Sequence, residues 1–148
     1  MLSVIDGFVA LTLAHDPVRN AAVAMLAEQC VTCFDNLRAR TGVGDIARRQ
    51  AAGPSSGLTP RQITLLLQWG YPYVFEEFRF HITLSGRLPL VEQERVLNAL
   101  QPLVRELNSE PLTIDALSVC VQARPHAPFV VARRYGFDGS TRCYFRDY

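Results

Sequence analysis

The segment Phe80-His81-Ile82-Thr83-Leu84 alternates strictly between apolar and polar side chains. In a β-strand, side chains two residues apart project from the same face. The pattern therefore predicts a strand over roughly residues 76–85, with His81 and Thr83 together on one face and the apolar side chains on the other. An imidazole beside a hydroxyl suits binding and proton transfer at a phosphate. We treat His81 and Thr83 as the candidate catalytic pair.

Helix signals occur at three further places. Asp16-Pro17 and Thr59-Pro60 each put a capping side chain before a proline at the first helical position. Apolar residues then recur at helical spacing. The expected helices are residues 17–40, residues 60–69 and residues 91–107, the last with a proline inside it.

Strand-like composition appears at residues 4–13, 112–122, 127–135 and 142–145. The order strand, helix, helix, strand, helix, strand, strand favours an α+β fold with a mainly antiparallel sheet and helices packed on one face. A chain of 148 residues suits a single domain, residues 1–148. Within it, residues 41–58 have the composition of a flexible loop, with a short helical turn at 45–50.

The bulk composition excludes several classes of protein. Hydrophobic residues make up 49% of the chain and the formal net charge is +1. This balance permits a core and gives no electrostatic case for a nucleic-acid or membrane partner. No apolar stretch approaches a membrane span, and the first residues lack a basic region that would begin a signal peptide. We therefore expect a cytoplasmic protein.

Four cysteines occur, and two of them, Cys30 and Cys33, have CxxC spacing. This spacing is compatible with a redox pair or half of a metal site. It falls in an expected helix, and Cys120 and Cys143 are too far apart in sequence to complete a typical zinc motif. Ordinary free thiols are the simpler interpretation in a reducing cytosol.

The run GYPYVFEEFRFHITLSGRL, residues 70–88, closely resembles the second H-x-T region of the 2H phosphoesterase superfamily. Within that superfamily it is similar to a DUF1045-like branch that is found with phosphonate-degradation operons. Weaker similarity extends over residues 4–134. The resemblance implies a two-lobed fold with two H-x-T motifs facing each other across a cleft. It further implies a metal-independent hydrolase in which two histidines serve as acid and base, and threonines hydrogen-bond the phosphoryl oxygens. No cofactor is implied.

The same resemblance implies a small phosphorylated metabolite as the substrate, such as a cyclic phosphate or phosphodiester of phosphonate breakdown. The family's first H-x-T motif would precede the strand at residues 4–13, so we expect the domain to be N-terminally incomplete. His15 and His126 lie in turn contexts and do not replace the missing histidine. A two-histidine site would then require a second copy of the chain, and we expect a homodimer or larger species.

Further side chains near the motif are candidates for substrate binding. Arg79 shares the strand face of His81 and is the best candidate for binding an anion. Arg87 is either a phosphate ligand or a solvated turn residue, and Tyr73 either borders the cleft or packs. Glu77, unlike Glu76, has the same strand parity as His81 and could orient the imidazole or pair with an arginine.

Three functional interpretations remain open from the sequence. The first is a phosphoesterase in which His81 is the general acid or base and Thr83 binds phosphate, provided that a second histidine motif is supplied. The second is a non-catalytic, one-lobed module that binds a phosphorylated ligand or a protein partner. The third is an inactive fragment, with His81 an ordinary sheet residue.

Overall fold

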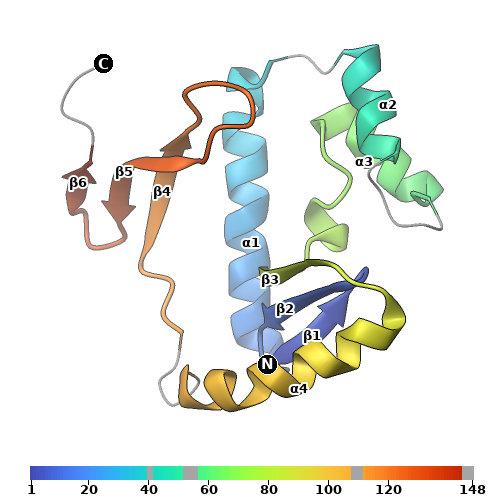
Figure 1. Ribbon diagram of the computed structural model, residues 1–148. Coiled ribbons are helices and arrows are strands. Elements are labelled where there is room, and N and C mark those ends of the chain that lie inside the picture. The colour runs from blue at the N-terminus through green and yellow to red at the C-terminus, as the bar shows by residue number, and fades with distance from the viewer. Residues whose placement is uncertain (40–41, 52–56, 108–111, 145–148) are drawn as a thin grey trace. The chain divides into compact units, whose positions relative to one another are not determined.

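The computed structural model describes residues 1–39, 42–51, 57–107 and 112–144. They form two compact units, Met1–Glu106 and Leu107–Tyr148. Each unit contains one three-stranded antiparallel sheet (Figure 1). The expected α+β class and antiparallel pairing are confirmed, although the strands divide between two sheets. The single-domain organisation of residues 1–148 stays a prediction.

The first two strands form a hairpin, β1 (Leu2–Ile5) with β2 (Phe8–Thr12). The two residues between them, Asp6 and Gly7, have φ values of +48° and +86°. A tight two-residue hairpin turn needs positive φ at both central positions, and Asp-Gly is a preferred pair for it. The expectation of one continuous strand over residues 4–13 is therefore wrong, because the chain reverses at this turn.

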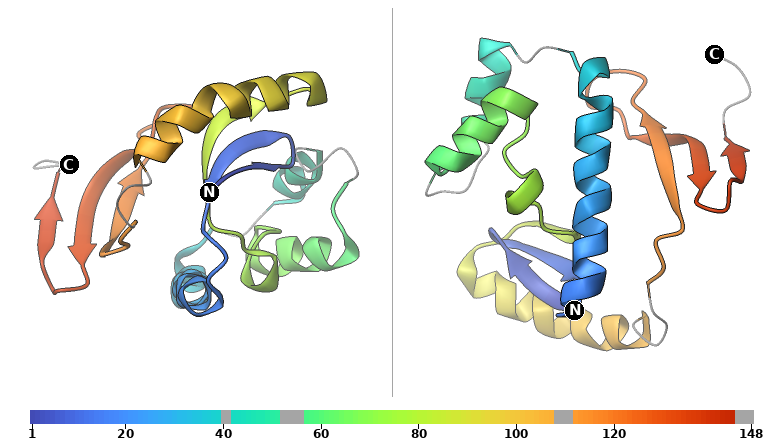
Figure 2. Two further views of the ribbon diagram at one scale, coloured as in Figure 1. Left: turned by 90° about the horizontal axis from the view of Figure 1, so that it is seen from below. Right: turned by 180° about the vertical axis from the view of Figure 1, so that it is seen from behind.

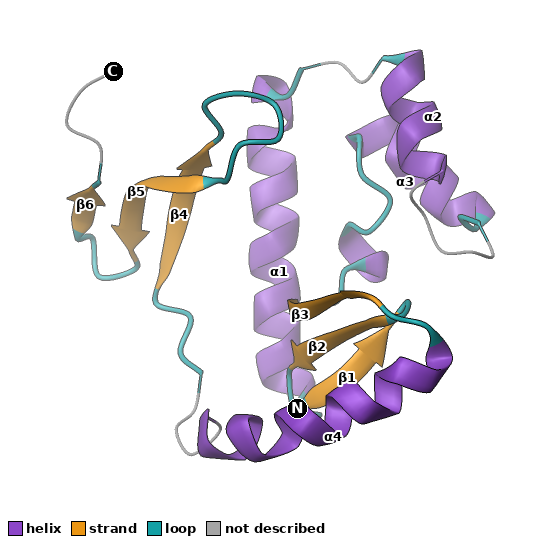
Figure 3. Cartoon of the chain, viewed as in Figure 1, coloured by secondary structure: helices purple, strands orange, loops and turns teal. Residues whose placement is uncertain are grey.

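The strand that carries the candidate pair, β3 (His81–Arg87), lies against β2. Thr83 stands opposite Ala10, and His81 stands opposite Thr12. The strand begins later than expected because the preceding residues form a short 3-10 helix, η2 (Phe75–Glu77). Figure 3 shows this change from helix to loop to strand just before β3.

A bulge interrupts the pairing of β2 with β3. The register shifts between Phe8 and Ala10, so that Val9, which pairs with Val4 of β1, has no partner residue on β3. The hydroxyl of Ser85 accepts a hydrogen bond from the Val9 N–H at 2.9 Å. This side chain therefore satisfies the main-chain donor that the bulge leaves over.

The expected helices are confirmed, with changed ends. Helix α1 (Pro17–Phe34) begins at Asp16, whose carboxylate accepts the Arg19 N–H at 3.0 Å. It ends before residue 40 and continues as the 3-10 helix η1 (Asp35–Leu37). Helix α4 (Leu90–Leu107) contains Pro102, as the sequence indicated.

Helix α3 (Pro60–Trp69) has both of its end signals in place. Thr59 and Gln62 form a reciprocal capping box at its start, and Gly70 ends it with φ of +72°. The segment expected to be a flexible loop contains a further helix, α2 (Val43–Ala51), which is longer than the predicted helical turn. Residues 52–56 of that segment lie outside the described part of the chain.

The buried apolar side chains of the first unit come mainly from β2 and α3. They are Val9, Ala10, Leu65, Leu66, Val74 and Val104. Leu65 and Leu66 lie in α3, at the start of the segment that leads to β3, and Ala10 stands opposite Thr83 on β3. Buried residues therefore adjoin both ends of the region that carries the candidate residues.

The second unit is a meander of β4 (Ala116–Val121), β5 (Val130–Gly136) and β6 (Thr141–Cys143), visible in both views of Figure 2. The predicted strands are present but shorter, and residue 145 lies outside the described residues. No side chain between residues 112 and 144 is buried. Over the described ranges, no helix combines the length and apolar character that crossing a membrane requires.

Candidate functional site

An open pocket of about 450 Å³ lies in the first unit. Its walls come from the β1–β2 turn, α3, the segment from residue 71 to 79, and β3. The catalytic and substrate-binding candidates from the sequence all line it: Tyr73, Arg79, His81, Thr83 and Arg87. The structure therefore brings these side chains together, while their roles stay predictions.

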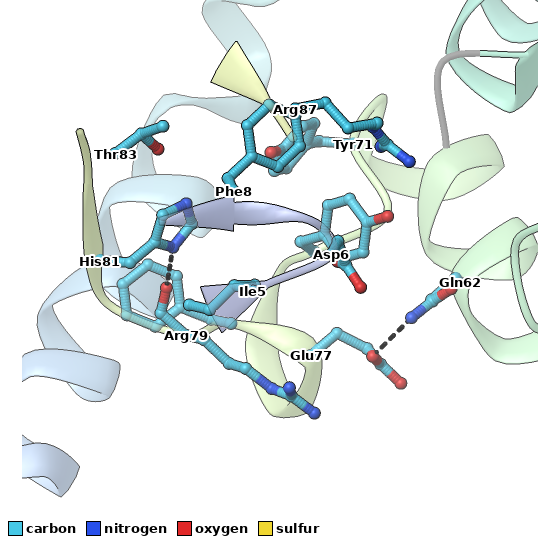
Figure 4. Close-up of a pocket in the computed structure, with 12 residues that line it drawn as sticks. Ile5, Asp6, Phe8, Gln62, Tyr71, Glu77, Arg79, His81, Thr83 and Arg87 are labelled. Atoms are coloured by element: carbon cyan, nitrogen blue, oxygen red, sulfur yellow. Dashed lines mark hydrogen bonds between the residues drawn. The ribbon is translucent and has the colours of Figure 1, made fainter. Parts of the chain in front are cut away.

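The ring of His81 is held by a local hydrogen bond. Its Nδ1 lies 2.8 Å from the main-chain oxygen of Arg79 (Figure 4). A carbonyl oxygen can only accept, so Nδ1 carries the proton and donates. In the neutral ring the lone pair is therefore on Nε2, which is the nitrogen left for proton exchange with a ligand.

Thr83 lies on the same side of β3 as His81, since both side chains line the pocket. The intervening Ile82 and the following Leu84 do not line it, and they are 44% and 41% exposed. The alternation read from the sequence is thus present in the structure. The small residue Ala10, which pairs with Thr83, is fully buried below this part of the sheet.

Two guanidinium groups face the pocket. Arg87 is the last residue of β3, and its guanidinium carbon lies 5.1 Å from the centre of the Phe8 ring. A Cβ at Gly7 would come within 3.2 Å of Arg87 Cγ, so the glycine permits this close approach. Within the described residues, neither Arg79 nor Arg87 forms an ion pair. Both charges are available to an anion.

Two tyrosines form part of the wall. The rings of Tyr71 and Tyr73 meet edge to face, with centroids 5.6 Å apart. Burial raises the pKa of the Tyr73 hydroxyl above its ordinary value of 10.0, and the negative charge of Asp6 raises it further. Tyr73 is therefore a protonated hydrogen-bond donor at neutral pH.

The opposite side of the pocket is acidic. Glu77 Oε2 accepts a hydrogen bond from Gln62 Nε2 at 2.8 Å, and Asp6 lies at the turn between β1 and β2. Glu77 faces the pocket, as the even spacing between Glu77 and His81 suggested, but Glu77 belongs to the 3-10 helix η2 and not to a strand. The Glu77 carboxylate is hydrogen-bonded to Gln62, and the imidazole of His81 is hydrogen-bonded to the main chain of Arg79. Glu76 points elsewhere and pairs with Arg61.

Sequence reasoning missed two of the polar residues in this site, Asp6 and Gln62. Local sequence signals next to both residues could have identified them as part of the site. The Asp-Gly pair marks the hairpin turn that puts Asp6 at the rim. The Thr59-to-Gln62 capping box marks the start of α3 and directs the glutamine side chain back over that end of the helix.

The remaining candidates lie outside the pocket. His15 and His126 are both exposed and near turns, as expected, and neither lines it. Cys30 and Cys33 lie on α1 as free thiols, the first half-buried and the second exposed. Among the described residues, no group of three or more His, Cys, Asp or Glu side chains is placed to hold a metal ion.

Comparison with known proteins finds one family. The model of the family described as "Protein of unknown function (DUF1045)" matches residues 1–130. A "Ribose 1,5-bisphosphate phosphokinase PhnN" from Janthinobacterium sp. (strain Marseille) is 40% identical over 118 residues, which cover 77% of this chain and 25% of that protein. A protein of the same name from Laribacter hongkongensis (strain HLHK9) is 49% identical over 37 residues, or 25% of this chain and 9% of its own length.

The chain thus spans a quarter or less of each curated relative. No solved structure matches it. The match to the family model includes every described residue of the pocket, because all of them lie between residues 5 and 87.

Proposed function

The chain belongs to the DUF1045 family, and from this premise we propose that it is a 2H-type phosphoesterase that acts on a cyclic phosphate or phosphodiester metabolite of phosphonate metabolism. The similarity of residues 70–88 to a 2H phosphoesterase motif supports the reaction class. The names of the two relatives refer to ribose 1,5-bisphosphate, a small phosphorylated sugar, which supports the same general class of ligand.

The observation that carries the proposal is the hydrogen bond between His81 and Arg79. It leaves the basic Nε2 of a neutral imidazole in the same pocket as a hydroxyl, Thr83, and two arginines. In this function Thr83 donates a hydrogen bond to a phosphoryl oxygen. Arg79 and Arg87 balance the negative charge of the phosphate, and Tyr73 donates a hydrogen bond to another part of the same ligand.

His81 transfers one proton in the reaction. As a base, its Nε2 removes the proton of an attacking water or hydroxyl; as an acid, it protonates the leaving oxygen. The attacking and leaving oxygens lie on opposite sides of the phosphorus in an in-line displacement. One imidazole therefore reaches one of the two oxygens, and a second group must serve the other. For this reason we expect the isolated chain to have reduced activity, seen as slow turnover of substrate.

One observation favours a second candidate function, a non-catalytic module that binds a phosphorylated ligand. Among the described residues, the pocket contains one histidine. The arginines, Thr83 and Tyr73 can still hold a phosphate without turning it over. In this interpretation His81 serves as a hydrogen-bonding residue.

A comparison of His81→Ala with His15→Ala tests the proposal. The substrates are bis(4-nitrophenyl) phosphate and a 2′,3′-cyclic nucleotide, with EDTA present. Loss of an acid–base group lowers the rate about 10²- to 10⁴-fold. We expect that loss for His81→Ala and an unchanged rate for His15→Ala, whose ring is exposed and outside the pocket.

Other outcomes separate the candidates. Equal turnover by His81→Ala and the unsubstituted chain would rule out the phosphoesterase proposal. Binding of the cyclic nucleotide in calorimetry, without turnover by any variant, would support the binding module. Thr83→Val removes only the hydroxyl and should weaken binding of either substrate, whereas Thr141→Val in β6 should not.

A further inference from the structure

We propose that Asp6 and Glu77 accept hydrogen bonds from the hydroxyl groups of a sugar phosphate whose phosphoryl group lies at His81 and Thr83. This inference rests on the proposed function, because the proposed function places the phosphoryl group at His81 and Thr83. The inference adds a hydroxylated part of the ligand and the two carboxylates that bind that part.

The pocket is divided by charge. Figure 4 shows Asp6 and Glu77 across the pocket from His81 and Thr83, with Gln62 beyond Glu77. An ionised carboxylate can only accept hydrogen bonds. The part of a ligand that reaches this side must therefore donate them, as a hydroxyl does and an ionised phosphate does not.

Glu77 is oriented before any ligand binds. The N–H of Thr59 donates to Gln62 Oε1 at 3.0 Å, which fixes the glutamine amide at the start of α3. The other end of the same amide, Nε2, donates to Glu77 Oε2 at 2.8 Å. The capping box thereby holds one carboxylate oxygen and leaves Oε1 of Glu77 for a ligand, an arrangement that lowers the entropic cost of binding.

Asp6 and Tyr73 together can bind one hydroxyl group of the ligand. The Tyr73 hydroxyl is close enough to Asp6, Glu77 and Arg87 for all three charges to act on it. A phenol donates and a carboxylate accepts. A sugar hydroxyl can satisfy both, because it accepts from Tyr73 while it donates to Asp6.

The same charges disfavour a second phosphate at this side of the pocket. The two carboxylates would repel it. The two arginines that line the pocket, Arg79 and Arg87, are the groups that balance the first phosphate in the proposed function. We therefore expect one phosphoryl group and one hydroxylated group in the bound ligand.

Isothermal titration calorimetry on the 148-residue chain tests the inference with three probes: ribose 5-phosphate, inorganic phosphate and 2-aminoethyl phosphate. A hydrogen bond to a charged group changes affinity roughly tenfold or more. We expect ribose 5-phosphate to bind about tenfold more tightly than inorganic phosphate. The ratio of these two affinities is the readout, because removing a carboxylate also strengthens phosphate binding in general.

Three variants should reduce that ratio towards one. Asp6→Asn suits the positive φ at this position, which asparagine tolerates. Glu77→Gln keeps an acceptor for Gln62. Gln62→Glu keeps the acceptor of the capping box but repels Glu77, so it tests the positioning role of Gln62. Glu94→Gln makes the same charge change as Glu77→Gln on an exposed residue of α4 that does not line the pocket, and it should leave the ratio unchanged.

Each remaining outcome counts against the inference in a distinct way. Equal affinity for ribose 5-phosphate and inorganic phosphate, or a ratio that survives Asp6→Asn and Glu77→Gln, overturns the sugar site and leaves the proposed function standing. Tighter binding of 2-aminoethyl phosphate than of ribose 5-phosphate identifies an ammonium site instead. No binding of any probe overturns both the inference and the proposed function.

Discussion

The imidazole Nδ1 of His81 donates to the main-chain oxygen of Arg79, two residues earlier in the chain, at 2.8 Å. The contact is entirely local, since donor and acceptor are separated only by Phe80. It depends on the chain being non-helical just before β3, which allows the carbonyl to turn towards the ring. Through it the backbone selects which ring nitrogen can exchange protons.

The first prediction concerns the tautomer of His81. We expect the neutral ring to carry its proton on Nδ1, because the Arg79 carbonyl can only accept. Long-range ¹H–¹⁵N correlation spectra distinguish the two tautomers, and His15 is the internal control. A neutral His81 protonated on Nε2 would contradict the assignment and remove the basis for Nε2 as the reacting nitrogen.

The second prediction concerns the core beneath the site. Leu66 is fully buried in α3, while its neighbour Leu67 is 59% exposed. Leu66→Ala should lower the free energy of unfolding by about 2–5 kcal/mol, because it removes buried apolar surface and leaves a cavity. Leu67→Ala should lower it by about 0.5 kcal/mol or less. Urea unfolding measures both, and equal losses would show that the core is not centred on Leu66.

The third prediction concerns alkaline pH. Folding raises the pKa of Tyr73, chiefly by burial and then through Asp6. A group with a raised pKa in the folded state contributes stability that is present below its ordinary value of 10.0 and is lost as the pH rises through the folded value. We expect Asp6→Asn to move the Tyr73 pKa back towards that ordinary value.

Titration of the tyrosine ring carbons by NMR measures this shift, with Tyr71→Phe used to assign the neighbouring signal. The same titration of Glu94→Gln, outside the pocket, should leave Tyr73 unchanged. A Tyr73 pKa that does not respond to Asp6→Asn would mean that the two side chains do not share the pocket in solution.

The fourth prediction concerns self-association. Among the described strands of the first sheet, β3 is paired on one side only, and it exposes Ile82 and Leu84. Unpaired strand edges with apolar side chains favour pairing with another chain. We expect dimers or larger species in sedimentation velocity, and we expect Ile82→Lys to shift them towards monomer.

Val18→Lys provides the matched control, because Val18 is 80% exposed on α1 and is not part of a strand. A monomer at every concentration would refute self-association. A dimer in which the two His81 rings lie far apart would refute a shared two-histidine site while leaving the dimer itself in place.

Much of the local structure could be predicted because its causes are local. Capping residues followed by proline set the starts of α1 and α3, and Gly70 sets the end of α3. Alternation placed His81 and Thr83 on one face. The same reasoning failed at the Asp6-Gly7 hairpin, where strand-like composition on both sides hid the turn signal. It underestimated α2, because small and polar residues indicated a loop with only a short helical turn.

What the sequence by itself determined is therefore where most of the helices begin and end, and that His81 and Thr83 share one face of a strand. Tertiary structure decided which distant residues complete the pocket. Asp6 and Glu77 are separated by about half of the chain, and they meet at one pocket only because β2 pairs with β3 and Gln62 reaches Glu77 from α3. Neither propensity nor spacing encodes such contacts, since they arise when separate elements bury their apolar faces together.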